Sequence, residues 1–524
     1  MSSQTLSHSK STTFRGTSMT AAAGVMLAIA ALWCIGWFVH ARHYWEDDAY
    51  IHLEFARSVA QGHGYEFNGH VVNGDTSSLW VLLLVLSHAF IPDWMIAGKV
   101  LTVAGLIFAL AGAYFFAKRL TEGMEESSTF SAAMVLLLVT NPYFCYWAFS
   151  GMEALTAAGV TFWGVYVATA RKPGWPSFLT GCFLAGLGPV LRPEMVFFTA
   201  LISLLLLKQW FQLPGKASSP AKILLFLIGT LLVIGPFAVW STYALHTFGR
   251  IIPNTNAAKR ANPGDSVIKR LLNVYGLGFP LILVEFVVLA LAALLRPAAV
   301  RKVFRWPQFE ETLPLGGLLF VGWTIITTVF YIADHTYVQT RYVFVSAPGL
   351  LIALLAINYR RFPRWTYQAA FAFALIAGIG ISSVTVWPFI RNKTIGDQVM
   401  AQVATFMRSK LPSDAPVAVY AIGELAFVSQ HPVIDIGGIT RPGAIPYLSR
   451  PSIEMVHWAK SEGAKYYISG DQPESGAVLI YSIPTPEIGW SLNYKHYAQK
   501  GEVHIWKLPD TAPVTASASQ STAK

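Results

Sequence analysis

Three consecutive acidic residues, Glu46, Asp47 and Asp48, stand shortly after the first long apolar run of the chain. Adjacent carboxylates can divide acid–base work, because one accepts a proton while its neighbour orients it or binds a metal ion. Acids at a helix start also complement the helix dipole and cap free N–H groups, which is a purely structural role. The residue types leave open which of Asp47 and Asp48 is the base. They also leave open whether either aspartate binds a divalent cation such as Mg²⁺, Mn²⁺ or Ca²⁺.

Other ionisable and amide side chains stand in short polar segments between apolar runs. Such groups are costly at membrane depth unless they are paired, and they commonly mark a pathway or a site. Arg192 and Glu194 could equally be a mutually neutralised pair, and Arg341 could extend to the membrane interface. A lone His335 is more often a polar loop residue than a base. Because cations and amides suit a phosphate or a sugar, we predict substrate-binding roles for Glu153, Arg192, Glu194, Asn254, Lys259, His335 and Arg341.

The composition decides what must position these residues. Apolar residues make up 54% of the 524 and charged residues 13%, with a mean hydropathy of +0.47, whereas a soluble domain carries about 25% charged residues. A span needs roughly 20 apolar residues to cross about 30 Å of hydrocarbon. Runs such as Thr20–Phe38 and Ile223–Ala244 meet this length. The sequence therefore predicts a polytopic α-helical membrane protein.

The pattern of apolar runs predicts about 11 transmembrane helices, with the segment Ser77–Phe90 treated as re-entrant or interfacial. This choice places the loops rich in Lys and Arg on the cytoplasmic side of the membrane, as the positive-inside rule requires. The N-terminus is then cytoplasmic, and the acids and predicted binding residues share the outer face. The predicted spans are 20–40, 98–117, 129–148, 152–170, 177–190, 194–208, 223–245, 274–296, 314–332, 342–358 and 366–388.

The chain changes character after the last predicted span. Near-balanced charge from Arg391 onward predicts a soluble α/β domain on the outer side. Its predicted helices are Ile395–Lys410 and Ile453–Ser461, and its predicted strands are Ala415–Ala421, Pro432–Ile436, Ala464–Ser469 and Val503–Leu508. The predicted organisation is a cytoplasmic disordered tail (1–19), a transmembrane domain (20–390) whose first outer loop is 41–97, the α/β domain (391–510) and a disordered tail (511–524).

Charge and cysteine content exclude other classes. The net charge of +10 resides largely in short loops between apolar runs, which argues for membrane lipids and against nucleic acid as a partner. The three cysteines lie in or beside apolar segments without paired ligand spacing, so neither a disulfide framework nor a zinc site is predicted. Residues 49–61 carry apolar side chains at helical spacing and predict an amphipathic helix lying on the membrane.

Several motifs together resemble the GT-C glycosyltransferases, and most closely the branch of the mycobacterial terminal arabinofuranosyltransferases. The opening motifs are Asp47–Ile51, Phe55–Arg57, Gly62–Asn68 and Asn73–Trp80. Later motifs follow in the same order at Ser150–Leu155, Leu191–Glu194, Ile252–Thr255, Lys259 and Arg341–Tyr342, and the soluble end is similar at Ala421–Glu424 and Val433–Gly438. The sequence departs from the pattern around Asp75 and Ser78, where the family more often has an aromatic residue and a proline.

The resemblance implies a GT-C fold in a bacterial inner membrane with a periplasmic C-terminal domain. It implies an inverting transferase that moves a sugar, best guessed as arabinofuranose, from a polyprenyl-phosphate donor. The acceptor would be a periplasmic cell-envelope glycan, lipid or protein. In that family acids of the first outer loop are the proposed catalytic or metal-linked residues, which here are Asp47 and Asp48.

Other readings use the same architecture. A hexosyl, mannosyl or aminoarabinose transferase would differ in sugar or acceptor. A lipid-linked-sugar transporter would show internal pseudo-symmetry and helices broken near mid-membrane, and neither is evident in the sequence. A scaffold whose soluble domain binds a partner would leave the acidic loop without a role.

Overall fold

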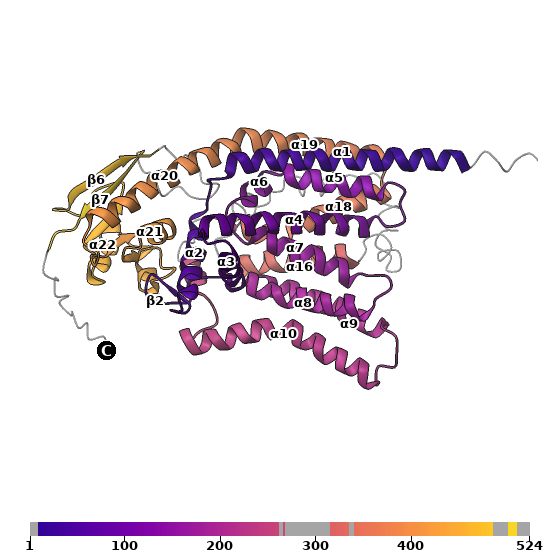
Figure 1. The fold of residues 1–524 in the computed structure, drawn as a ribbon, viewed down its shortest axis with the longest axis horizontal. Helices are drawn as coiled ribbons and strands as arrows, with labels where there is room; N and C mark the ends of the chain where they lie inside the picture. Colours follow the sequence, from indigo (N-terminus) through magenta and orange to yellow (C-terminus); the bar gives the residue numbers. More distant parts are fainter. Residues whose placement is uncertain (1–8, 261–265, 268–314, 335–339, 486–500, 511–524) are drawn as a thin grey trace, which may run out of the picture.

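The computed structural model describes residues 9–260, 266–267, 315–334, 340–485 and 501–510. The long helices lie side by side in one block, and the strand-containing C-terminal part sits against one end of that block (Figure 1). The helices of the block are α1 (Ser9–Ala41), α3 (Ser78–Phe90), α4 (Trp94–Leu120), α5 (Ser127–Thr140), α6 (Pro142–Ala148), α7 (Ala154–Ala168), α8 (Trp175–Leu191), α9 (Met195–Gln212), α10 (Pro220–Phe248), α16 (Leu315–Ala333), α17 (Thr340–Phe344), α18 (Ala347–Arg361) and α19 (Arg364–Ile381).

Length and apolar character identify membrane-spanning helices within the described ranges. Six helices are long and apolar enough to cross a membrane, or up to seven if the bent pair α5–α6 counts as one span. The helices α3, α7, α8 and α18 are apolar but shorter. The prediction of a mostly helical, multi-pass membrane protein is confirmed. The predicted span 274–296 lies outside the described residues.

The predicted single span 129–148 is broken by a bend of 72° between α5 and α6. Pro142 occupies the first turn of α6 and has no N–H to donate to α5. The side chain of Asn141 accepts hydrogen bonds from the backbone N–H groups of Tyr143 (3.0 Å) and Phe144 (3.3 Å), and so caps the new helix. Asn141 and Pro142 interrupt the apolar run in the sequence, and this cap and proline start a second helix.

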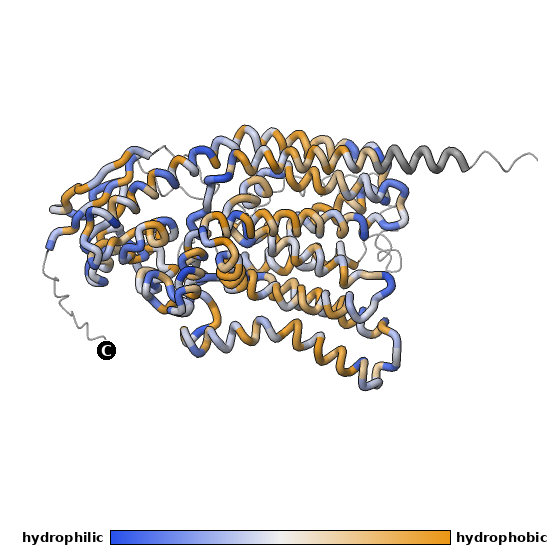
Figure 2. The backbone as a smooth tube through the Cα atoms, viewed as in Figure 1, coloured by the Kyte–Doolittle hydropathy of each residue, from blue (hydrophilic) through white to orange (hydrophobic). Residues whose placement is uncertain are grey.

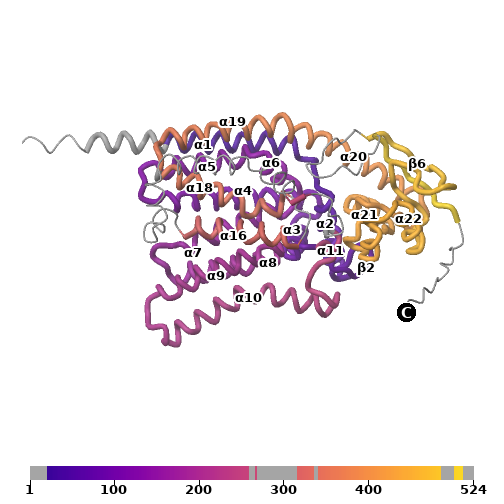
Figure 3. Tube along the Cα trace, turned by 180° about the vertical axis from the view of Figure 1, so that it is seen from behind, coloured from indigo at the N-terminus to yellow at the C-terminus, as the bar shows by residue number. Residues whose placement is uncertain are grey.

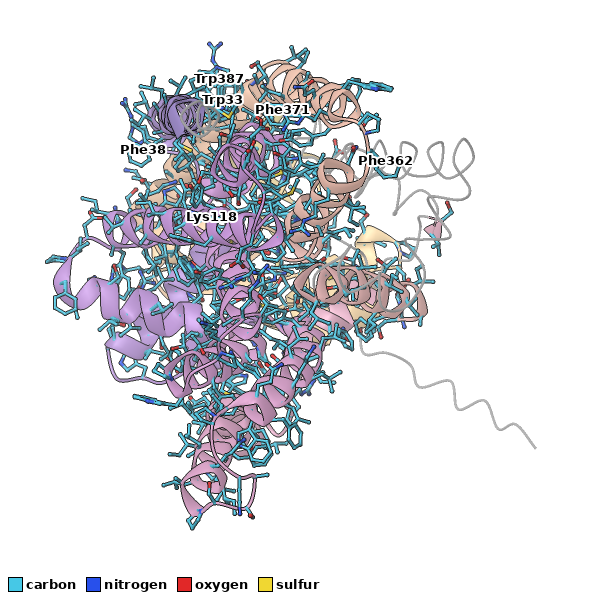
Figure 4. The ribbon with its side chains drawn as sticks, turned by 90° about the vertical axis from the view of Figure 1, so that its right-hand side faces the viewer. Trp33, Phe38, Lys118, Phe362, Phe371 and Trp387 are labelled. Atoms are coloured by element: carbon cyan, nitrogen blue, oxygen red, sulfur yellow. The ribbon has the colours of Figure 1, made fainter. Side chains whose placement is uncertain are left out.

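Polar residues gather at the two ends of the block, while the helix bodies are apolar (Figure 2). The end facing the C-terminal part carries the start of α7 and the ends of α8 and α10 (Figures 1 and 3). The opposite end, which Figure 4 views directly, carries the labelled Lys118 of α4 and Phe362 after α18. The predicted binding segments around residues 48, 153, 192 and 254 therefore share one end, and the basic loops near 118 and 171 share the other.

The last span continues into the C-terminal part without a break. α19, a short π-helix (Ser382–Val386) and α20 (Trp387–Lys410) form one apolar-to-polar helix of 47 residues. The predicted boundary at residue 391 thus falls inside a helix. Figure 1 shows α20 extending from the block to the strands.

The C-terminal part contains a mixed sheet of five strands in the order β4-β3-β5-β7-β6. β3 pairs in parallel with β4 and β5, whereas β7 pairs antiparallel with β5 and β6. The four predicted strands are present as β3 (Val417–Val419), β4 (Val433–Asp435), β5 (Tyr466–Ser469) and β7 (Glu502–Lys507), while β6 (Val478–Pro484) was not predicted. The helices here are α21 (Ile422–Ser429), η3 (Pro442–Tyr447) and α22 (Ser452–Ser461), and α22 matches its prediction.

The predicted amphipathic helix is present as α2 (Asp47–Ala60), but its surroundings differ from the prediction. It lies between the helical block and the C-terminal part (Figures 1 and 3). Its apolar side chains, including Ile51 and Phe55, are buried. α3, α21 and the small hairpin of β1 (Glu66–Phe67) and β2 (His70–Val71) pack around it. Protein therefore covers the face that the sequence assigned to lipid.

Candidate functional site

Asp47 and Asp48 occupy the first turn of α2 but point to different partners. The carboxylate of Asp47 accepts hydrogen bonds from the backbone N–H groups of Gly423 (3.2 Å) and Glu424 (3.0 Å), at the start of α21. A helix start offers free N–H groups and a positive dipole end to an anion. The approach is close: a Cβ at Gly423 would lie 2.0 Å from the backbone oxygen of Asp47. Asp47 therefore joins the membrane helices to the C-terminal part.

Asp48 instead forms an ion pair with Arg341, which lies in α17. Arg341 is buried, while 29% of the Asp48 side chain remains exposed. The guanidinium of Arg341 lies 5.9 Å from the ring centre of Trp147 and 5.5 Å from that of Tyr342, within cation–π range. The structure thus brings together two predicted site residues that are 293 positions apart in sequence.

A group of carboxyls surrounds this junction. Glu46 accepts a hydrogen bond from the Tyr146 hydroxyl, and Asp397 of α20 pairs with Lys393. Burial raises the pKa of Glu46 to about 7 and that of Asp47 to about 6. Burial, with repulsion from nearby carboxylates, also raises the pKa of Glu424 well above its ordinary range. Near neutral pH, Glu46 and Asp47 therefore lie close to their pKa values, so a charge gained or lost nearby changes their protonation.

Glu153, Arg192 and Glu194 form one buried chain of charges. Arg192 pairs with Glu153 through Nη1, and its Nε lies 2.6 Å from Oε1 of Glu194. All three side chains are buried, and the Arg192 guanidinium lies 5.2 Å from the ring centre of Tyr342. Arg192 and Arg341 thus both approach Tyr342. Arg192 and Glu194 do pair, as the structural alternative to a binding role supposed, and Glu153 joins the pair.

The chain of charges continues through His52 of α2 to Asp75. Nδ1 of His52 lies 2.6 Å from Oδ1 of Asp75, and Nε2 lies 3.4 Å from Oε2 of Glu153. Asp75 also accepts hydrogen bonds from the hydroxyl of Tyr65 and, at 3.1 Å, from the backbone N–H of Ser77. Burial would raise the pKa of Glu153, but Arg192 and His52 beside it outweigh burial and hold that pKa well below its ordinary range.

Asn254 lies at the same end of the block, at the start of α11 (Asn254–Arg260). Its backbone N–H donates to the carbonyl of Asn73 (2.8 Å), and its side chain accepts a hydrogen bond from Arg250 (2.9 Å). α11 packs against η3 of the C-terminal part. Asn254 thus fixes its loop to the segment that carries Asp75. The side chain of Lys259 and all of His335 lie outside the described residues.

Sequence reasoning missed several members of this arrangement. His52 follows Asp48 by four positions, so the predicted helix already placed both on one face. Lys393 and Asp397 have the same spacing, but the predicted helix began at Ile395 and did not include Lys393. Asp75 stood out only as a departure from the family pattern. Glu424 stood out only as the end of the motif Ala421–Glu424, because its place in the site depends on how α21 docks against α2.

The arrangement is suited to acid–base and anion chemistry. It offers a partly exposed carboxylate beside a guanidinium, together with a second buried guanidinium. Among the residues that the structure describes, no group of three or more His, Cys, Asp or Glu side chains is arranged to hold a metal ion.

Comparisons with known proteins support the same architecture. A family model described as a domain of unknown function (DUF8728) matches residues 390–515. No curated protein sequence matches the chain. The fold is similar to crystal structures of ArnT from Cupriavidus metallidurans, one bound to undecaprenyl phosphate (TM-score 0.55, 13% identity, 92% of this chain and 97% of that chain) and one in the apo state (TM-score 0.56, 12% identity, 93% and 98%).

A second similar structure is the arabinofuranosyltransferase AftD from Mycobacteria, with a TM-score of 0.50 and 14% identity. The likeness covers 93% of this chain and 39% of that one. At these identities the likeness establishes the fold. The chain is thus a multi-pass membrane protein with the fold of GT-C glycosyltransferases.

Proposed function

We propose that this protein transfers a sugar from a polyprenyl-phosphate donor to an acceptor of the cell envelope. The reaction site is the end of the helical block that faces the C-terminal part. The fold supports this proposal, because one of the similar structures, ArnT, binds undecaprenyl phosphate. The observation that carries it is the pair of Asp48 and Arg341, a carboxylate and a guanidinium held together at that end.

Asp48 is the proposed catalytic base, and Arg341 the proposed phosphate ligand. The donor phosphate competes with Asp48 for Arg341, because a guanidinium binds a phosphate in the same geometry as a carboxylate. Asp48 can then accept the proton of the acceptor hydroxyl as that oxygen bonds to the anomeric carbon. The bond from that carbon to the phosphate oxygen breaks, and Arg341 stabilises the departing phosphate. Attack opposite the phosphate inverts the anomeric centre.

Asp47 has a different proposed role. Its two carboxylate oxygens already accept two backbone N–H bonds from α21. We assign it to docking of the C-terminal domain, which we place in the periplasm and propose as the acceptor-recognition part. The site would then lie at the outer face of a bacterial inner membrane, with the N-terminus in the cytoplasm.

The proposed sugar is arabinofuranose. The motif order shared with the arabinofuranosyltransferases supports a pentose, and the similarity to AftD agrees with it. The likeness to ArnT makes aminoarabinose the first alternative, followed by hexoses such as mannose. Buried Glu153, Arg192 and Glu194 are the proposed ligands of donor or sugar, because they continue from the Arg341 side of the site through Tyr342.

The test is sugar transfer by purified protein in detergent, with cell-envelope extract as acceptor and a panel of polyprenyl-phosphate pentoses and hexoses as donors. We expect transfer from one donor, lowered about 10²–10⁴-fold by Asp48→Asn, the range for removal of a general base. Asp47→Asn should lower transfer less, because an amide oxygen still accepts one backbone N–H bond.

A matched control is Asp93→Asn, which changes an acid of the same predicted outer loop. Asp93 caps α4 by accepting from the N–H of Ile96 (2.9 Å), and asparagine caps a helix equally well. This variant should keep the wild-type rate. Equal rates for Asp48→Asn and the wild type would refute the assignment of the base, and failure of every donor would refute the proposed function.

A further inference from the structure

His52 sits in a buried position between two carboxylates. It lies on α2, and 4% of its side chain is exposed. Nδ1 faces Asp75 at 2.6 Å and Nε2 faces Glu153 at 3.4 Å, while each of these carboxylate side chains is 1% exposed. The two partners come from different segments, the loop before α3 and the loop before α7.

This geometry constrains the protonation of the ring. A neutral imidazole has one N–H donor and one lone pair, so one of its nitrogens would face a carboxylate oxygen with its lone pair. An imidazolium has an N–H on both nitrogens, so neither nitrogen presents a lone pair to the carboxylate beside it. The two contacts are ion pairs by distance, and the ring N–H groups are not aligned for hydrogen bonds to these oxygens. Ionised carboxylates are acceptors only, so they cannot supply the missing proton. We infer that His52 is a permanently protonated internal cation, which positions Glu153 against Arg192 in the proposed donor site.

The surroundings of His52 agree with a charged ring. The charged groups that face it are Asp75 and Glu153, with the Tyr65 hydroxyl behind Asp75 and Arg192 behind Glu153. Burial alone would lower the pKa of His52, but the two carboxylates outweigh burial and raise that pKa to about 10. A second cation beside a buried carboxylate also adds Coulomb attraction to it.

The consequence for the site rests on the proposed function. Asp75, Glu153 and Glu194 are three carboxylates that share the two cations His52 and Arg192. Loss of the His52 charge would leave three carboxylates with one cation, close to the site proposed for an anionic phosphate. Donor binding would weaken, and Glu153 would lose one of the two partners that fix its orientation. His52 is therefore a positioning residue, acting through Glu153 and Arg192.

The first measurement is the protonation of His52 without substrate, by ¹⁵N NMR of histidine-labelled protein in detergent. The His52 resonances are identified as those absent from His52→Gln, or as those displaced in Asp75→Asn if His52→Gln does not fold. We expect both ring nitrogens to stay protonated from pH 6 to pH 9. A neutral ring at pH 7 would overturn the inference, whatever reaction the protein catalyses.

The second measurement uses Asp75→Asn, which removes the strongest attraction on the imidazolium and lowers the pKa of His52. In this variant the donor KM should rise about tenfold between pH 6.5 and pH 8.5 as the ring loses its charge, as expected for one charge near an anionic ligand. The wild type should show no such rise, and kcat should change less than KM. A pH-independent KM in Asp75→Asn, with the ring shown to titrate, would overturn the positioning role.

A matched control is His63→Gln, which changes an exposed histidine three residues from Glu66. It should leave both the NMR signals of His52 and the pH dependence of KM unchanged. Absence of sugar transfer by the wild type would count against the proposed function, while the NMR result would still decide the protonation of His52.

Discussion

The two ends of the helical block both carry Arg–Glu pairs, but they expose them very differently. At the end facing the C-terminal part, the Arg192 and Glu153 side chains are 3% and 1% exposed. At the opposite end Arg171 lies 3.3 Å from Glu122, with exposures of 67% and 40%, and Arg364 lies 3.1 Å from Glu126. Arg–Glu pairs are thus buried at one end of the block and exposed to solvent at the other.

The difference in burial distinguishes the candidate site at one end of the block from the solvated loops at the other end. An exposed ion pair contributes about 0–1 kcal/mol. A buried pair must first overcome desolvation, so hydrophobic residues in its place are often equally stable. Burying His52, Asp75, Glu153, Arg192 and Glu194 together therefore has no evident advantage for stability alone. We interpret the buried set as functional and the exposed set as loop charges near the membrane surface.

The largest expected effect comes from breaking the buried set. Arg192→Gln leaves Glu153 and Glu194 buried without their shared cation. It should lower the free energy of unfolding by about 3–5 kcal/mol, the usual cost of removing one partner of a buried pair. Chemical unfolding in detergent would measure this.

The matched control is Arg364→Gln at the exposed end, which should change stability by about 0–1 kcal/mol. Equal effects at the two ends would show that burial does not distinguish them. The comparison would then no longer support a functional reading of the buried charges.

A second, smaller effect tests how the site end is joined to the C-terminal part. Gly423→Ala places a Cβ 2.0 Å from the Asp47 backbone oxygen, so α2 and α21 must separate locally. Overpacking of this kind costs about 1–3 kcal/mol. We expect a lower thermal midpoint and faster proteolytic release of residues beyond α20.

Gly463→Ala is an informative control for that variant. Gly463 also lies in the C-terminal part, and open space surrounds the position of its added Cβ. Its φ of +97° makes any side chain strained, so stability should fall without release of the domain. Release in both variants would mean that general destabilisation, and not the Asp47 contact, controls docking.

Much of the fold was predictable because it depends on local patterns. The long apolar runs predicted the membrane helices, and the four strands predicted after residue 391 are β3, β4, β5 and β7. The bend between α5 and α6 was missed because apolar content does not report the Asn141 cap. β6 was missed although four of its seven residues are Val, Ile or Tyr, which favour strands.

The candidate site was predictable only residue by residue. Ionisable side chains beside apolar runs indicated Asp48, Glu153, Arg192 and Arg341, and the structure brings these to one end of the block. Their partners were not predictable, because the contact of Asp48 with Arg341 depends on packing of segments 293 positions apart. The exposure of α2 was mispredicted for the same reason, since docking of α21 covers its apolar face.

The smallest expected effect is a pH dependence confined to the site end. Burial raises the pKa of Glu46 from its ordinary value of 4.5 to about 7, so the folded protein holds that proton more tightly than the unfolded chain does. The resulting stability is fully present below pH 4.5 and is lost as the pH rises towards 7. Asp47, whose pKa is raised to about 6, acts in the same direction. We therefore expect the thermal midpoint to fall between pH 4.5 and pH 7.

Glu46→Gln should make this fall shallower, because glutamine cannot ionise. Glu126→Gln at the exposed end should leave the fall intact, since both buried carboxyls remain. An unchanged slope in Glu46→Gln would assign the pH dependence to other groups and remove this distinction between the two ends.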